Sequence, residues 1–313
     1  MDNLCHTLAG AALGEAGLKR RTTMGTATLV IASNLPDIDV AVFATDTLAM
    51  SFRRGWTHGV LALAVLPALL AGVMLMWDRW RRRSNPARPP GHWRGLILLS
   101  YLGTWLHVFM DWLNSYGVRL LKPFSDRWFY GDALYIIDPI LYVVFGAAIV
   151  LGRMSATRGD ADPWRWPRRG LALAAVYALL MLASNGWARA EVNGGLERAG
   201  REGTRFMVTP VFGNPLRREV IVDVGERYEK GFLWFDPLPH FRPAGYGVPT
   251  NLADPAVVHA TEHPRIQAFL MWSRFPFFVV ERTAAGTRVF VNDYRYSGPS
   301  GRDGWPTQSV SIP

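Results

Sequence analysis

Four long apolar stretches constrain this chain more than any other feature of its sequence. Val60–Trp77 and Gly170–Trp187 each run for 18 residues without a charged side chain. Gly95–Leu113 is interrupted by a single histidine–aspartate pair, and Ala133–Gly152 carries one charged residue, Asp138. A helix of about 20 apolar residues, with a range of roughly 17–25, crosses the hydrocarbon core of a bilayer. All four stretches therefore qualify as membrane-spanning helices.

Two shorter apolar segments, Leu4–Leu18 and Thr22–Leu35, come before them. They have 15 and 14 residues, so we expect a tilted or re-entrant hairpin packed against the longer helices. From Arg189 onward no stretch qualifies as a span, and the composition becomes that of a soluble domain. The sequence thus predicts a mainly α, multi-spanning transmembrane helical bundle of about four to six membrane segments over residues 1–189. A C-terminal β-rich (α+β) extramembrane domain is predicted over residues 190–313.

The predicted extramembrane domain alternates short apolar segments with turns. Its β-branched and aromatic residues, with their alternating pattern, are typical of strands, and Pro243–Gly245 is one of the expected turns. The segment Pro255–Ser273 is expected to be helical in part. The expected strands are Phe206–Val211, Glu219–Val224, Tyr228–Phe235, Phe277–Glu281 and Arg288–Tyr296.

The basic residues are distributed unevenly. The net charge is +9, but residues 1–189 hold 20 Lys and Arg against 12 Asp and Glu, whereas residues 190–313 hold 14 against 13. The excess lies in three short loops, Lys19–Arg21, Asp78–Arg94 and Gly152–Arg169. This is the positive-inside pattern of a bacterial-type inner membrane protein, and it argues against a nucleic-acid partner. With those loops in the cytoplasm, the C-terminal domain would lie on the periplasmic side.

His107 and Asp111 stand out because they lie four residues apart inside an apolar stretch. At that spacing the imidazole and the carboxylate share one face of a helix, within reach of a single ion. Ionisable side chains inside a membrane-length segment are costly, so each raises a functional-site hypothesis. The pair is therefore the first candidate for a metal site.

The orientation set by the basic loops brings other histidines and aspartates to the same outward end of the helices. Imidazole nitrogen and carboxylate oxygen are ligands for a divalent cation. There are more candidates than one ion needs, so two ions about 3.5–4 Å apart could be held. The candidates are His6, Asp37, Asp39, His58, His107, Asp111, Asp132 and Asp138.

Several candidates have a structural alternative. His107 and Asp111 could form a buried hydrogen bond that stabilises helix packing. Asp37 could terminate a helix, and Thr57 could cap the next one and leave His58 without a role. Asp138 comes before a proline, which suits an N-cap followed by proline at the first helical position, and we favour that role. No lysine-bearing glycine-rich phosphate loop, Cys-x-x-Cys pair or Gly-x-Ser-x-Gly elbow is present to point to another chemistry.

An ordered series of six motifs lies within residues 1–150: Met1–Glu15, Asn34–Asp39, Arg54–His58, His107–Gly117, Pro123–Arg127 and Ile137–Pro139. This series resembles the family of LexA-regulated, membrane-bound metal-dependent hydrolases of the inner membrane. The resemblance implies a multi-spanning helical protein of the bacterial inner membrane with a zinc-type site of one or two ions, by distant likeness to zinc-dependent phospholipase C. Carried over by motif position, the metal ligands would be His6, Asp37, His58, His107 and Asp111.

Together these features predict a membrane-embedded hydrolase of a phosphoester or other ester, including lipid-linked esters, that uses a metal-activated water. Asp39 or Asp132 would accept the proton, and Arg54 or the neighbouring Arg53 would steady an anionic substrate. Membrane lipid is the expected partner. Two alternatives stay open. One is a non-catalytic protein with a structural metal site, and the other is a small-solute transporter with midplane carboxylates, which the clustering at one end of the helices disfavours.

Overall fold

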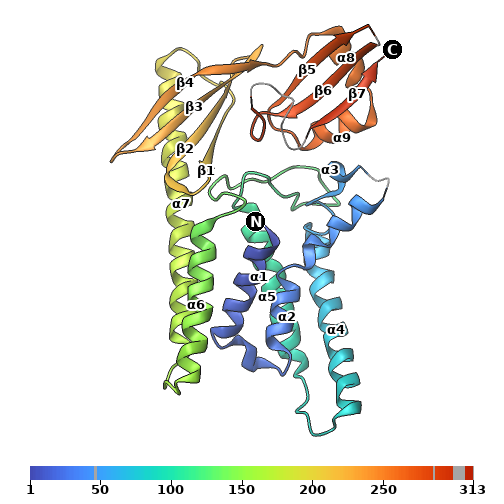
Figure 1. Cartoon of the computed structure of the whole chain (residues 1–313), viewed down its shortest axis with the longest axis vertical. Helices are drawn as coiled ribbons and strands as arrows, with labels where there is room; N and C mark the ends of the chain where they lie inside the picture. Colours follow the sequence, from blue (N-terminus) through green and yellow to red (C-terminus); the bar gives the residue numbers. More distant parts are fainter. Residues whose placement is uncertain (46–47, 285, 299–306, 313) are drawn as a thin grey trace. The chain divides into compact units, whose positions relative to one another are not determined.

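The computed structural model describes residues 1–45, 48–284, 286–298 and 307–312 (Figure 1). The chain divides into two compact units. Met1–Ala41 and Arg53–Ala183 form the first, and Val42–Phe52 and Ser184–Pro313 form the second. The predicted boundary at residues 189 and 190 falls within helix α7, which contributes to both units.

The first unit is helical, as predicted. Asp2 caps α1 by accepting hydrogen bonds from the backbone of Leu4 and Cys5. Asp138 caps α6 in the same way and is followed by proline in the first turn, which confirms the favoured capping role. The helices of this region are α1 (Asn3–Glu15), η1 (Leu18–Arg21), α2 (Gly25–Ala32), η2 (Leu35–Ala44), α4 (Val60–Ser84), α5 (Trp93–Trp112), α6 (Pro139–Thr157) and α7 (Arg165–Arg198).

Within the described residues, three helices are long and apolar enough to cross a membrane: α4, α6 and α7. A fourth candidate is the pair α2 and η2, which is bent by 51°. The predicted count of four to six spans is therefore not confirmed. The predicted span Gly95–Leu113 corresponds to α5, which is 20 residues long but is not among the three. Its polar residues, including His107 and Asp111, lower its hydropathy and are buried inside the unit.

The outer faces of the long helices are apolar. On α4 the side chains of Leu61, Val65, Leu69 and Val73 are exposed and recur every four residues, so they form one stripe along the helix. In water such a stripe would be unfavourable, whereas in a bilayer it faces lipid. The exposed stripe therefore agrees with a membrane location for this unit.

Small residues bring α2 and α5 close together. A Cβ atom added at Gly103 would lie only 2.6 Å from the Cβ of Ala32, so glycine is required for this approach. The contact sets the C-terminal end of α2, with Ser33, directly beside α5. The same two segments supply parts of the candidate site.

The second unit contains two antiparallel sheets, with strand orders β1-β2-β3-β4 and β5-β6-β7. The five predicted strands are confirmed as β1 (Phe206–Val211), β2 (Asn214–Asp223), β3 (Arg227–Phe235), β5 (Pro276–Thr283) and β6 (Gly286–Asp293). The predicted partial helix is two short helices, α8 (Pro255–Ala260) and α9 (Pro264–Trp272), and the unit also contains α3 (Ala49–Phe52).

Two strands were not predicted, β4 (Pro239–Pro249) and β7 (Gln308–Ile312). The prediction of a turn at Pro243–Gly245 was wrong, because these residues lie inside β4. In its sheet β4 pairs only with β3, and one side of an edge strand need not donate hydrogen bonds. Proline is therefore tolerated there, although it argues against a strand in the sequence.

Candidate metal centre

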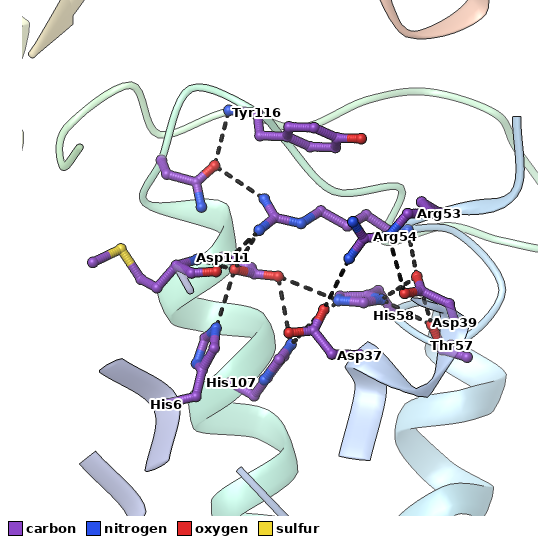
Figure 2. A network of polar contacts seen from close by, with 12 residues as sticks. His6, Asp37, Asp39, Arg53, Arg54, Thr57, His58, His107, Asp111 and Tyr116 are labelled. Carbon is purple, nitrogen blue, oxygen red and sulfur yellow. Dashed lines mark hydrogen bonds and ion pairs between the residues drawn. The ribbon is translucent and has the colours of Figure 1, made fainter. Parts of the chain in front are cut away.

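Four buried side chains meet in the helical unit: Asp37, His58, His107 and Asp111 (Figure 2). Each offers one ligand atom, and these atoms all lie within 4.8 Å of one another. Asp37 comes from η2, His58 from the segment just before α4, and the other two from the last turns of α5. Residues distant in the sequence therefore form one compact group that could hold a metal ion.

The spacing of the donor atoms suits one small cation. The Nε2 atoms of His58 and His107 are 3.3 Å apart, and they lie 3.3 and 3.4 Å from Oδ2 of Asp111. Oδ1 of Asp37 is 3.9 Å from Nε2 of His107. Ligands bound at about 2.0–2.2 Å to a tetrahedral zinc ion lie about 3.3–3.6 Å from one another. The two imidazoles and the Asp111 carboxylate match that geometry, and the Asp37 oxygen lies slightly farther out.

The second nitrogen of His107 fixes the state of its ring. Nδ1 lies 2.7 Å from the backbone carbonyl oxygen of Ser33, which can only accept a hydrogen bond. Nδ1 therefore carries the hydrogen and donates it. In the neutral ring, Nε2 then has its lone pair directed into the cluster, which is the form that binds a metal.

His58 is fixed in the same way through a hydroxyl group. Thr57 Oγ1 donates to Oδ2 of Asp39 at 3.2 Å, so its only hydrogen is used. The contact of 3.0 Å between His58 Nδ1 and Thr57 Oγ1 must then be donated by the histidine. Two imidazole lone pairs and a carboxylate thus face one another at 3.3–3.4 Å, an arrangement that needs a positive charge among them.

The Thr57 hydroxyl should support metal affinity. We expect Thr57→Val to weaken zinc binding by about 10–100-fold, the usual effect of losing a hydrogen-bond partner of a metal-binding histidine. Titration of the purified full chain against a competing zinc chelator would measure this. Thr57→Ser is the matched control, because it keeps the hydroxyl and should bind zinc as tightly as the unaltered chain. Equal affinity in the valine variant would contradict the assigned histidine tautomer.

Arg54 is buried against the cluster. Its Nη2 lies 3.0 Å from Oδ1 of Asp111, and its Nη1 donates to Oδ1 of Asn114 at 3.1 Å. The guanidinium also lies 4.5 Å from the centre of the Tyr116 ring. Arg54 was predicted to steady an anionic substrate. These contacts fit a side chain that neutralises and positions one of the candidate metal ligands. A role of Arg54 toward a substrate stays a prediction.

His6 lies beside the four-residue group and is not part of it. Its Nε2 is 3.3 Å from Oδ1 of Asp111, on the opposite oxygen from His58 and His107. The rings of His6 and His107 stack with their centres 3.8 Å apart. The amino group of Met1 also pairs with Oδ1 of Asp111. Ligation by His6 stays a prediction.

The two carboxylates predicted to accept a proton differ in their surroundings. Asp39 is buried and accepts hydrogen bonds from the backbone N–H of Arg54 at 2.7 Å, from Thr57 and from Arg53 Nε at 3.4 Å. These bonds favour a positioning role for Asp39 over proton transfer. Asp132 is buried, with φ at 51°, and does not belong to the four-residue group.

Arg53, the other arginine predicted to steady an anion, is partly exposed. Its side chain is 19% exposed, and its Nη2 lies 3.5 Å from Oδ1 of Asp37. Figure 2 shows Arg53 reaching toward Asp37 and Asp39. A guanidinium at this rim can contact both the cluster and an incoming anion.

The two groups that orient the histidines, the Thr57 hydroxyl and the Ser33 carbonyl, were not predicted from the sequence. Thr57 was considered only as a helix cap, yet α4 has Gly59 at its N-cap and no side-chain cap bond. The position of Thr57 directly before His58 was the available signal. The role of the Ser33 carbonyl could not be predicted, because every residue has a backbone carbonyl.

A membrane-embedded helical unit with a buried histidine–aspartate cluster defines the class of this protein. Residues 1–192 match the family described as YdjM inner membrane protein, and the chain belongs to that family. The prediction that the chain belongs to an inner-membrane protein family is thereby confirmed. Hydrolase activity and a likeness to zinc-dependent phospholipase C stay predictions.

A relative in Bacillus subtilis (strain 168) is described as uncharacterized protein YfhP. It is 25% identical over 160 residues, which is 48% of this chain and 46% of the relative. The chain thus matches about half the length of this relative. No solved structure matches this chain.

Proposed function

We propose that this protein is a membrane-embedded, metal-dependent hydrolase of phosphoesters or other esters, including lipid-linked ones. One observation carries the proposal: His58 and His107 are both held with Nε2 directed at Asp111 in a fully buried cluster. A divalent ion of the zinc type, when bound, polarises an ester oxygen and lowers the pKa of water. The residues around the ion would hold it, orient its ligands and neutralise their charge.

Each surrounding residue has a separate task in this proposal. Arg54 keeps Asp111 ionised and in place, because a buried carboxylate needs a fixed counter-charge. Asp39 orients His58 through Thr57. Asp39 and Asp132 were both predicted to accept a proton, and Asp132 takes that role in this proposal. The partly exposed Arg53 contacts the anionic group of the substrate.

A lipid-linked substrate is supported by the surface beside His58. The backbone N–H of Val60 donates to the carbonyl of Leu120 at 2.9 Å, so the turn after Leu120 lies beside the start of α4. Three large apolar side chains in these two segments are exposed: Trp56, Leu121 and Phe124, the last at 77%. Exposed apolar groups next to a buried polar site suit a substrate with acyl chains.

The proposal also includes the orientation in the membrane. The cluster lies at the starts of α1 and α4, whereas the basic residues of η1 and of the last turn of α4 lie at their other ends. If those basic ends are cytoplasmic, the site opens toward the periplasm. The C-terminal residues 190–313 would then follow α7 on the periplasmic side.

A structural metal site is the second candidate. Structural zinc sites are closed by four protein ligands, and four candidate ligands are present here. In that case Asp37 would complete the coordination, and no substrate would reach the ion.

Turnover separates the two candidates. We expect the purified, zinc-loaded full chain to hydrolyse bis(p-nitrophenyl) phosphate or dioleoylphosphatidylglycerol. Arg53→Gln should raise the KM for these phosphodiesters about tenfold, because one charge-assisted contact to the anion is lost. It should leave hydrolysis of the neutral ester p-nitrophenyl acetate unchanged. Arg127→Gln, an exposed arginine of the neighbouring loop, is the matched control. A metal-loaded chain that turns over none of these esters would favour the structural site.

A further inference from the structure

A basic cavity lies at the other end of α1 from the candidate metal centre. It has a volume of about 180 Å³ and is formed where η1 meets the beginning of α7. The helix α1 has 13 residues and is therefore about 20 Å long, with His6 near its start. The two sites are thus separate within the helical unit. The cavity is lined by Ala16, Gly17, Leu18, Arg20, Arg21, Trp164 and Arg168.

Two guanidinium groups share one indole in this cavity. The guanidinium of Arg20 lies 5.0 Å from the centre of the Trp164 ring, and that of Arg168 lies 5.7 Å from it. Nε of Arg168 also donates to the backbone carbonyl of Ala16 at 3.2 Å. The indole stabilises each cation, but it cannot offset the repulsion between them. An anion bound between the two groups would do so.

Within the described residues, no carboxylate pairs with the arginines that line this cavity. Glu15 is the acidic residue at the end of α1, and it already pairs with Lys19 and with Arg153. Across the residues that the structure describes, Arg20, Arg21 and Arg168 form no ion pair with a carboxylate. The cavity therefore has an excess of positive charge that the protein itself does not compensate.

The backbone around the cavity is closely packed. A Cβ atom added at Gly25 would lie 2.6 Å from the Cα of Lys19, and one added at Gly95 would lie 2.5 Å from the carbonyl oxygen of Arg21. The glycines let α2 and α5 press directly on η1. The turn that carries Arg20 and Arg21 is thus held in place before any ligand arrives, which lowers the cost of binding.

We propose that this cavity binds the phosphate group of an anionic ligand. Arginine favours phosphate because its planar group donates two parallel hydrogen bonds. The volume equals roughly six waters in the liquid, which is enough for a phosphate and part of its ester. The headgroup of an anionic phospholipid is the favoured source, because basic pockets between helix ends and tryptophans both occur at the membrane interface. Free inorganic phosphate is the other source of the same chemistry.

Native mass spectrometry of the full chain in neutral detergent tests this proposal. The probes are dioleoylphosphatidylglycerol, dioleoylphosphatidylcholine and inorganic phosphate. We expect the anionic lipid to bind more tightly than the zwitterionic one, and Arg20→Gln with Arg168→Gln to weaken it at least about tenfold. Arg20→Lys with Arg168→Lys keeps the charge and should restore part of the affinity. The control pair, Arg83→Gln with Arg88→Gln, removes two exposed arginines of another basic loop and should change it less than about twofold.

The outcomes separate the two sources and the proposal itself. Anionic lipid that stays bound in the presence of excess inorganic phosphate would assign the cavity to a lipid headgroup. Displacement by phosphate would assign it to the free ion. Equal loss in the test and control pairs would show diffuse surface attraction and overturn the proposal. Equal binding of the two lipids, with no binding of phosphate, would overturn it as well.

Discussion

His107→Ala should abolish stoichiometric metal binding by this protein. The substitution removes one of the two imidazole nitrogens that could bind the metal. This atom, Nε2 of His107, lies 3.4 Å from Oδ2 of Asp111. We expect zinc affinity to fall by more than the roughly 10–100-fold of a second-layer change such as Thr57→Val. Hydrolysis of any ester should be lost together with the metal. Elemental analysis of the purified full chain, followed by chelator titration, measures the effect.

His92→Ala is the matched control for that substitution. His92 precedes the same helix, α5, and is exposed at its N-terminal end. Its loss should leave the metal content unchanged. Asp111→Asn gives a second test of the site, since it removes a ligand and keeps the shape. That variant also removes the negative charge that faces the buried Arg54, so its stability must be measured beside its metal content. Unchanged metal in both His107→Ala and Asp111→Asn would remove the cluster from consideration as a metal site.

Part of this site could be predicted from the sequence because helix geometry relates residue spacing to the face on which a side chain lies. Helical spacing of four guarantees that His107 and Asp111 share a face, whatever surrounds the helix. The apolar stretch around them made their burial predictable. Asp37 and His58 were reached by a weaker route, the expectation that one end of the bundle collects the ligands. Their distances to α5 depend on packing between helices, which a single sequence does not encode locally.

Arg53 and Arg54 show where sequence reasoning stops, because the sequence left open which of the two would contact an anionic substrate. The two residues are neighbours of the same type, so composition and spacing cannot distinguish them. In the structure Arg54 has φ at 49°, in the left-handed region, and its guanidinium turns inward to Asp111. The side chain of Arg53 stays at the rim. The left-handed backbone at Arg54 thus goes with a guanidinium that faces Asp111, whereas the side chain of Arg53 stays partly exposed.

In the second unit, strands were predicted where apolar and polar residues alternate regularly, and they were missed where proline and glycine dominate. The segment Pro239–Pro249 owes its strand conformation to its neighbour β3, with which it pairs despite an irregular register near Gly231. Local propensity alone favours a turn there. Tertiary pairing overrides it at the edge of the sheet, where a proline costs least.

A buried ion pair joins the helical and strand parts of this second unit. Asp293, at the end of β6, is fully buried and accepts two hydrogen bonds of 2.9 Å from the guanidinium of Arg295. It also accepts from Ser273 Oγ at 2.5 Å and from the backbone of Arg274 at 2.8 Å, just after α9. The guanidinium lies 4.5 Å from the ring of Trp272. This carboxylate therefore holds the end of β6 to the residues that follow α9.

Asp293→Asn should destabilise this unit strongly. The substitution keeps the shape of the side chain but removes the charge of Asp293 that faces the buried Arg295 guanidinium, which costs about 3–5 kcal/mol. Amide hydrogen exchange in β6 of the full chain should accelerate by more than about a hundredfold. Asp254→Asn is the matched control. It removes the same charge from an ion pair with Arg282 that is largely exposed, and asparagine can still cap α8. Exchange in β6 should not respond to it.

The pH dependence of the same exchange provides an independent check. Burial alone would raise the pKa of Asp293, but the charge and hydrogen bonds of Arg295, with those of Ser273 and the backbone, outweigh it and lower the pKa. A carboxyl whose pKa is lower in the folded state stabilises fully above its unfolded pKa of about 3.9 and loses that contribution as the pH falls through the folded value. The unaltered chain should therefore lose protection in β6 below about pH 4, after correction for intrinsic exchange. Asp293→Asn should lack this step, and its difference from the unaltered chain should shrink as the pH falls. A difference that stays constant from pH 7 to pH 3 would show that packing, rather than the charge of Asp293, holds these segments together.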